Sequence, residues 1–220
     1  MQVLSVVAQK GGAGKTTLTG HIAVQAERAG AGPVGVLDAD PQESLSDWWS
    51  ERVSDTPIVV QTSLWRLDED IRHMRDIGVE LLLIDTPPGV TSTIRSAIEA
   101  SDLVLVPARA SPHDLRATGR TVALVKGMGK PLVFVVNGAS SRARVTVGAA
   151  IALSQHGTLA PVTVHERAEF ATSMIDGRTV MEVARTSTSA LEITELWAYL
   201  ERRLSGRYEA TSLRPMMEVA

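Results

Sequence analysis

Short apolar stretches alternate along the chain with longer stretches in which apolar residues recur at helical spacing. The short stretches are nearly continuous and rich in Val, Ile and Leu, which is typical of strands covered on both faces. They span residues 3–8, 34–37, 58–60, 81–84, 103–106 and 132–136. The helical stretches span residues 16–29, 43–53, 67–77, 91–100, 113–126 and 145–156. This alternation predicts βαβ units, and therefore a doubly wound, mostly parallel sheet flanked by helices.

The pattern becomes less regular after residue 157. It predicts a last strand over 158–164, a short helix over 167–174 and a terminal helix over 189–204. We find no internal repeat and no linker composition, so we expect a single domain over residues 1–204. Residues 205–220 lack sustained periodicity and are predicted to form a C-terminal tail.

The composition excludes several classes of protein. With 22 Lys+Arg against 25 Asp+Glu, the net charge is −3, which argues against a globally basic nucleic-acid binder and leaves room for a local patch. Cysteine is absent, so disulfides, thiolate metal sites and iron–sulfur clusters are excluded. Lysine is scarce, and two of the four lysines, Lys10 and Lys15, lie in one glycine-rich segment.

The sequence carries no sign of export or membrane insertion. The first predicted strand begins directly after Met1, with no leader before it. No apolar run approaches the roughly 18–20 residues that span a bilayer. We therefore expect a cytoplasmic protein.

The segment from Gln9 to Thr17 has the composition and context of a phosphate-binding loop. It follows a predicted strand and opens a predicted helix, as such a loop requires. Glycines allow backbone N–H groups to converge on phosphate oxygens, and the helix adds its positive end. Lys15 would neutralise the β- and γ-phosphates, and the Thr16 hydroxyl would complete a Mg²⁺ shell. The predicted nucleotide-binding residues of the loop are Gly11, Gly12, Ala13, Gly14, Lys15, Thr16 and Thr17.

Two later strands end in carboxylates. Asp38 and Asp40 follow the second predicted strand, on the edge where doubly wound sheets bind ligands. Asp38 and Asp40 cannot both point directly at the γ-phosphate because of the pleat, and a turn-capping role is an equally favoured interpretation of Asp38. Asp85 follows four apolar residues, which is the arrangement of a carboxylate that holds Mg²⁺. The next residues are predicted to form a switch loop that senses the γ-phosphate, and they are Thr86, Pro87, Pro88 and Gly89.

The loop departs from its common form in one informative way. Gln9 stands where a glycine is usual, and Lys10 follows it, which gives the pattern Lys-Gly-Gly-x-Gly-Lys-Thr-Thr. This deviant loop resembles that of the ParA/MinD family of ATPases, and further segments resemble the short plasmid-type, ParF-like partition proteins. The further segments are Asp40-Pro41-Gln42-x-Ser44-Leu45-x-x-Trp48, Ser101-Asp102-Leu103-Val104, and Pro107 with Ser111-Pro112-x-Asp114.

The resemblance implies a set of roles. Lys10 would reach across a dimer to the partner's nucleotide, so the active form would be an ATP-sandwich homodimer that binds ATP and Mg²⁺. Asp40 would orient the attacking water, and Asn137 would contact adenine. A ParB-like or cargo adaptor protein would stimulate hydrolysis, and the segment with Ser111 and Asp114 would contribute to the dimer.

The resemblance also implies non-specific DNA binding by the ATP dimer and association with the nucleoid. Such binding needs a few phosphate contacts per protomer, which dimerisation doubles. Any single arginine is more often a solvated surface residue, but the C-terminal third is rich in arginine. The candidate DNA contacts are Arg142, Arg144, Arg167, Arg178, Arg185, Arg202 and Arg203.

Three other interpretations remain open. A metabolic P-loop ligase of the dethiobiotin synthetase type would share the fold but would not need Lys10. A MinD-like regulator would bind membranes, yet residues 209–220 contain Pro215, two Glu and a single Arg, which suits a membrane helix poorly. A positioner of a protein assembly would use the same chemistry as a plasmid partition protein. From the length of the chain, we do not expect the winged-helix domain of larger partition ATPases.

Overall fold

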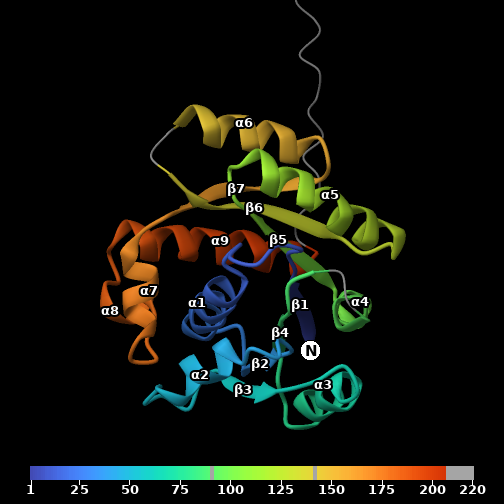
Figure 1. Ribbon diagram of the computed structural model, residues 1–220. Helices are drawn as coiled ribbons and strands as arrows, with labels where there is room; N and C mark the ends of the chain where they lie inside the picture. Colours follow the sequence, from blue (N-terminus) through green and yellow to red (C-terminus); the bar gives the residue numbers. More distant parts are fainter. Residues whose placement is uncertain (90–91, 141–142, 207–220) are drawn as a thin grey trace, which may run out of the picture.

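Seven strands form one sheet in the part of the chain that the computed structural model describes, residues 1–89, 92–140 and 143–206. The strand order is β3-β2-β4-β1-β5-β6-β7, and all neighbouring strands are parallel (Figure 1). The strands are β1 (Gln2–Val6), β2 (Val34–Asp38), β3 (Ile58–Gln61), β4 (Leu81–Asp85), β5 (Leu103–Ala108), β6 (Leu132–Ala139) and β7 (Thr158–His165).

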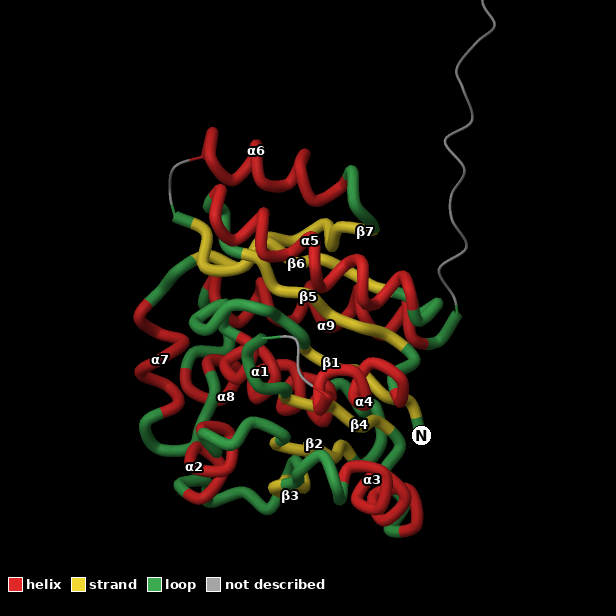
Figure 2. Tube along the Cα trace, turned by 45° about the vertical axis from the view of Figure 1, so that its right-hand side comes forward, coloured by secondary structure: helices red, strands yellow, loops and turns green. Residues whose placement is uncertain are grey.

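Helices cover both faces of this sheet (Figures 1 and 2). One face carries α1 (Lys15–Arg28), α2 (Ser44–Ser50), α7 (Ala168–Met174), α8 (Val180–Val183) and α9 (Thr188–Leu204). The other face carries α3 (Leu67–Asp76), α4 (Ser92–Ala100), α5 (Pro112–Gly127) and α6 (Ala143–Ser154). The predicted doubly wound architecture is therefore confirmed.

The near-continuous apolar strands have a direct structural reason. In β4, Leu81 and Leu83 pack into the core beneath α1 and α9, whereas Leu82 and Ile84 pack into the core beneath α3. Successive side chains of a strand point to opposite faces, so a strand covered on both sides needs apolar residues at every position.

The predicted elements are all present, with shifted ends. The predicted helix over 43–53 is shorter, because α2 ends at Ser50, and β6 extends past the predicted strand to include Asn137. The four-residue helix α8 was not predicted. Residues 207–220, most of the predicted tail, lie outside the described residues, and the single-domain assignment stays a prediction.

The parallel sheet brings the carboxyl ends of its strands to one edge. β1, β2 and β4 are neighbours there, and the register places Asp38 beside Asp85. The loop after β1 and the two acidic strand ends therefore meet. Within the described ranges, no helix is long and apolar enough to cross a membrane.

Candidate nucleotide-binding site

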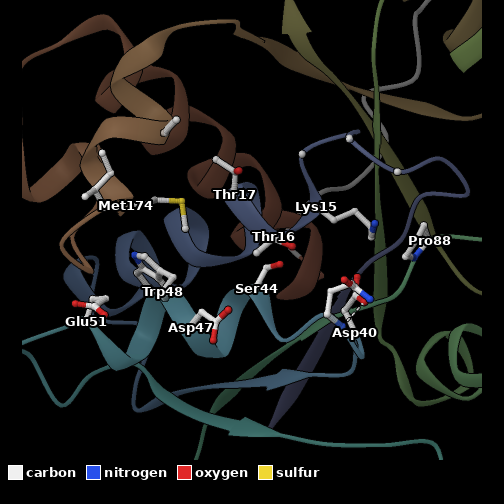
Figure 3. Close-up of a pocket in the computed structure, with 16 residues that line it drawn as sticks. Lys15, Thr16, Thr17, Asp40, Ser44, Asp47, Trp48, Glu51, Pro88 and Met174 are labelled. Atoms are coloured by element: carbon white, nitrogen blue, oxygen red, sulfur yellow. Dashed lines mark hydrogen bonds between the residues drawn. The ribbon is translucent and has the colours of Figure 1, made fainter.

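The glycine-rich loop forms the wall of an open cavity of about 670 Å³ at this edge of the sheet (Figure 3). Gly12 and Gly14 have φ angles of 75° and 87°, a left-handed conformation that favours glycine. Gly14 is also the N-cap of α1 and gives its first turn no side-chain cap. The N-terminus of α1 is therefore open toward the cavity, as an anion-binding site requires.

Lys15 and Thr16 begin α1 and line the same cavity. Lys15 is buried, with 6% of its surface exposed, so its ammonium lies in the wall of the cavity and not in bulk solvent. The predicted residues Gly11, Gly12, Gly14 and Thr17 line the cavity as well, while Ala13 faces the core. This arrangement suits a polyphosphate.

Asp85 is held close to Thr16 at the end of β4. The Thr16 hydroxyl donates to the Asp85 carboxylate over 2.7 Å, and the carboxylate is fully buried. Burial raises the pKa of Asp85 to about 7, against the opposing effects of the Thr16 hydrogen bond and Lys15, and with reinforcement from Asp38 and Asp40. A cation bound here would favour the charged form of Asp85.

The oxygen donors of Thr16 and Asp85 fit Mg²⁺. A Mg²⁺ ion beside phosphate takes one or two protein ligands and completes its shell with phosphate oxygens and water. In residues 1–89, 92–140 and 143–206, no group of three or more His, Asp or Glu side chains is placed to hold a metal ion. Thr16 and Asp85 would thus hold the cation together with the nucleotide, and the cation would neutralise charge on the β- and γ-phosphates.

The two carboxylates after β2 have different surroundings. Asp38 is fully buried and accepts hydrogen bonds from the backbone and hydroxyl of Ser46, both over 2.9 Å, and from the backbone of Asp40. Asp38 therefore holds the turn before α2 in place. Asp40 is partly exposed and lines the cavity, where its carboxylate also accepts from the backbone of Gln42 over 3.0 Å.

The predicted switch loop contacts the phosphate-binding loop directly. The backbone N–H of Gly89 donates to the Gln9 carbonyl over 2.7 Å, and the Thr86 hydroxyl donates to the Val6 carbonyl over 2.8 Å. Pro88 lines the cavity, while Pro87 is buried behind it. A movement of the switch loop would therefore disturb its hydrogen bond to the phosphate-binding loop.

Lys10 lies on the other side of the loop, toward α5. Its ammonium is 3.1 Å from the carboxylate of Asp114, and half of its side chain (51%) is exposed. The Ser111 hydroxyl also donates to Asp114 and caps α5. The three residues from the loop and from the predicted dimer segment thus form one contact within the protomer.

Asn137 lies against the glycine loop. Its amide donates to the Ala13 carbonyl over 2.7 Å and fills the space where a Cβ at position 14 would stand. A second hollow of about 140 Å³ is lined by Asn137, Gly14 and Thr17, with Arg109 and Phe170 among its other residues. The hollow adjoins the glycine-rich loop, and the adenine contact expected of Asn137 stays a prediction. Sequence reasoning missed Arg109, whose only signal was its position just after β5.

The candidate DNA-binding arginines lie on elements that cover opposite faces of the sheet. Arg144 is exposed on α6, whereas Arg185 and Arg202 are exposed on the α8–α9 side. Arg167 forms two hydrogen bonds with Glu192, at 2.6 and 2.9 Å, and Arg178 pairs with Asp176. Arg203 is partly exposed on α9, and Arg142 lies outside the described residues.

The fold and the loop define the chain as a P-loop nucleotide-binding protein. A family model for the CobQ/CobB/MinD/ParA nucleotide binding domain (CbiA) matches residues 4–180. The chain belongs to this family, and the resemblance inferred from the deviant loop is confirmed.

Individual relatives agree with this assignment. The "Maintenance of carboxysome distribution protein A" of Halothiobacillus neapolitanus is 26% identical over 203 residues, covering 88% of this chain and 93% of that protein. "Protein ParA" of Rhizobium radiobacter is 27% identical over 130 residues, or 57% of this chain and 56% of that protein. The septum site-determining protein MinD of Pyrococcus horikoshii, solved with Mg-ADP, has the same fold with a TM-score of 0.77 at 17% identity, covering 94% and 99% of the two chains.

Proposed function

We propose that this chain is a ParA-type ATPase that dimerises around ATP, binds DNA non-specifically and positions a cargo. The observation that carries the proposal is the pair of lysines on one loop. Lys15 lies buried in the wall of the phosphate cavity, and Lys10 lies half exposed on the other side of the loop, toward α5. A nucleotide site within one protomer needs Lys15 to bind phosphate but does not need Lys10.

The residues that line the cavity have separate roles in hydrolysis. The backbone of the loop, the start of α1 and Lys15 bind the phosphates and neutralise the charge that develops on them. Thr16 and Asp85 would hold Mg²⁺, which would neutralise phosphate charge. Asp40 orients the attacking water from the opposite wall of the cavity, and Asp38 keeps the turn that carries Asp40 in place.

Lys10 would complete the site of a second protomer. Its exposed side chain leaves Asp114 and reaches the partner's phosphates in the dimer, so nucleotide binding and dimerisation become one event. Slow turnover suits this scheme, because the bound nucleotide acts as a switch and a partner protein accelerates the reset.

The named relatives bear on the identity of the cargo. The relative from Halothiobacillus neapolitanus is named for carboxysome distribution, which favours a protein assembly as cargo. The resemblance to plasmid-type partition proteins makes a plasmid or chromosome the alternative cargo. A ParB-like or cargo adaptor protein would link the ATPase to either cargo. Non-specific DNA binding would hold the dimer on the nucleoid, within the cytoplasm.

The two lysines provide a matched test of the nucleotide site. Lys15→Ala is expected to weaken ATP binding by at least roughly a hundredfold, because a charge-assisted contact to phosphate is lost. Lys10→Ala is expected to keep ATP affinity within about threefold and to lose the ATP-dependent dimer. Titration with a fluorescent ATP analogue and sedimentation of the same samples measure both. A Lys10→Ala chain that dimerises like wild type contradicts the role of Lys10 and favours a ligase of the dethiobiotin synthetase type.

Phosphate release with different activators tests the biological role. We expect duplex DNA together with the product of the neighbouring gene to raise the ATPase rate several-fold above either alone. Stimulation by anionic liposomes instead would indicate a MinD-like membrane regulator, and turnover that requires a small carboxylate would indicate a metabolic ligase.

A further inference from the structure

Two rows of unpaired charge flank the phosphate-binding loop. The α2 acidic row consists of Glu43, Asp47 and Glu51, spaced four residues apart on and beside α2. The α5 basic row consists of Arg116 and Arg120, also four residues apart. All five side chains are exposed, and none of them forms an ion pair with another described residue.

The like charges within each row repel each other, although Asp47 in the first turn of α2 interacts favourably with the positive end of the helix dipole. Like charges four residues apart lie side by side on a helix and repel each other. Glu51 is moreover the C-cap of α2, next to the negative end of the helix dipole, and Arg116 is in the N-terminal half of α5. The stability of the protomer therefore does not account for Glu51, Arg116 and Arg120.

The two rows lie on opposite sides of the loop. Asp47 and Glu51 line the phosphate cavity together with Gly11, Gly12 and Asp40 (Figure 3). Arg116 and Arg120 line a separate hollow of about 380 Å³ whose remaining walls come from Gln9, Lys10 and Ala117. The loop is thus shared by an acidic flank on the α2 side and a basic flank on the α5 side.

The position of Lys10 fixes how two copies would have to meet. Lys10 lies on the basic flank, whereas the phosphate cavity opens along the acidic flank. For Lys10 to reach the phosphates of a second copy, the basic flank of one protomer must face the acidic flank of the other. A two-fold axis then makes the same contact twice, because each patch meets its complement on the partner.

We propose that the α5 basic row of one protomer docks on the α2 acidic row of a second copy of this chain, and that these two equivalent contacts set the orientation of the ATP-bound dimer. This inference rests on the proposed function, since it specifies the surface of the dimer that ATP induces. Complementary charge of this kind steers association and excludes the opposite orientation, in which like rows would meet.

Charge reversal tests the pairing. The variants are Asp47→Arg with Glu51→Arg, Arg116→Glu with Arg120→Glu, and a chain that carries all four substitutions. Sedimentation velocity with Mg²⁺ and a non-hydrolysable ATP analogue gives the dimer affinity. We expect each two-residue reversal to weaken the dimer by at least roughly tenfold, and the fourfold variant to restore it toward wild type. A charge-matched control, Arg72→Glu with Arg75→Glu on α3, is expected to dimerise like wild type.

The outcomes separate this inference from the proposed function. A wild-type chain that stays monomeric with the ATP analogue overturns both. A wild-type dimer together with two-residue variants that dimerise equally well overturns the inference alone, as does a fourfold variant that stays monomeric. If Arg116→Glu with Arg120→Glu leaves the dimer intact and abolishes binding to duplex DNA, the basic row is a DNA contact and the inference is wrong.

Discussion

At the scale of single residues, His21 connects α1 to α7 and α8. It lies fully buried in α1, with Nδ1 2.8 Å from the Thr17 carbonyl, to which it donates. Nε2 accepts from the backbone N–H of Val180 over 3.3 Å, and the ring meets Phe170 edge-on. Burial lowers the pKa of His21 to about 4, despite the opposing effects of the Thr17 carbonyl and Glu182. The imidazole is therefore neutral in the folded chain.

The buried histidine predicts a stability that falls in acid. Its pKa is about 4 when folded and 6.5 in the unfolded chain, so between these values the unfolded state binds more protons and stability decreases as the pH falls. Asp85, with its raised pKa, acts in the opposite direction and masks part of this trend. The difference between wild type and His21→Asn isolates the effect, since asparagine retains a donor and does not titrate.

Urea unfolding of both chains at pH 7 and pH 5 measures this difference. From pH 7 to pH 5 we expect wild type to lose about 2 kcal/mol relative to His21→Asn. Parallel pH dependence in the two chains would show that His21 titrates normally in the fold.

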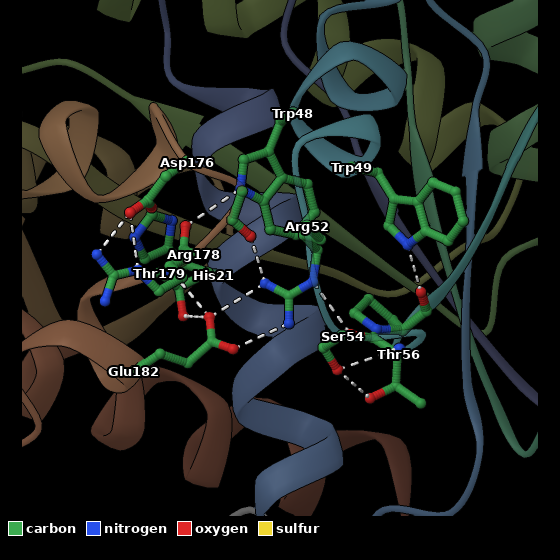
Figure 4. A network of polar contacts seen from close by, with 12 residues as sticks. His21, Trp48, Trp49, Arg52, Ser54, Thr56, Asp176, Arg178, Thr179 and Glu182 are labelled. Carbon is green, nitrogen blue, oxygen red and sulfur yellow. Dashed lines mark hydrogen bonds and ion pairs between the residues drawn. The ribbon is translucent and has the colours of Figure 1, made fainter.

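At the scale of elements, an ion pair joins Arg52, two residues after the end of α2, to Glu182 in α8 (Figure 4). The Arg52 guanidinium bonds both carboxylate oxygens of Glu182, at 2.9 and 3.1 Å, and the Gly177 carbonyl at 2.5 Å. It also stacks over Trp48, with 5.1 Å to the ring centroid. Burial opposes ionisation of Glu182, yet hydrogen bonds from Arg52 and Thr179 hold its pKa below the usual range. The α2 wall and the α7 wall of the phosphate cavity are thereby held in a fixed position relative to each other.

Removing the Arg52 side chain is expected to lower the free energy of unfolding. Arg52→Ala leaves the Glu182 carboxylate and the Gly177 carbonyl without their main partner, and Arg52 has only 3% of its side chain exposed. We expect a loss of about 3 kcal/mol in the free energy of unfolding, measured in urea. Arg178→Ala is the control, because the exposed Arg178–Asp176 pair is screened by solvent and its loss should move the midpoint little. Equal urea midpoints for the two variants would contradict a structural role of the Arg52–Glu182 ion pair.

The limits of sequence reasoning follow from the same elements. The long strands and helices were predictable because their periodicity extends over several residues, and the loop residues were predictable because chemistry fixes their spacing. The helix α8 has four residues, too few to show a period, although the capping box of Thr179 and Glu182 was a usable signal. Arg52 and Glu182 are 130 residues apart, so no local pattern could have paired them.

At the scale of the whole molecule, the strand order brings the residues of the site together at one edge of the sheet and leaves that edge accessible. β1 lies between β4 and β5, so the loop after β1 has the Asp85 strand end on one side and α5 on the other. The phosphate cavity consequently opens on one edge of the sheet, where a second copy can cover it. The sequence indicated the loop and the acidic strand ends of this edge, but the contact of Lys10 with Asp114 within one protomer became visible only in the structure.

The oligomeric state of Asp40→Ala tests the central claim most directly. If Asp40 orients the attacking water, removing its carboxylate should slow hydrolysis at least roughly a hundredfold and leave the binding of Mg²⁺·ATP intact. Sedimentation of this variant with Mg²⁺·ATP and with Mg²⁺·ADP is the measurement. We predict a stable dimer with ATP and a monomer with ADP. A chain that binds ATP and remains monomeric would contradict the account.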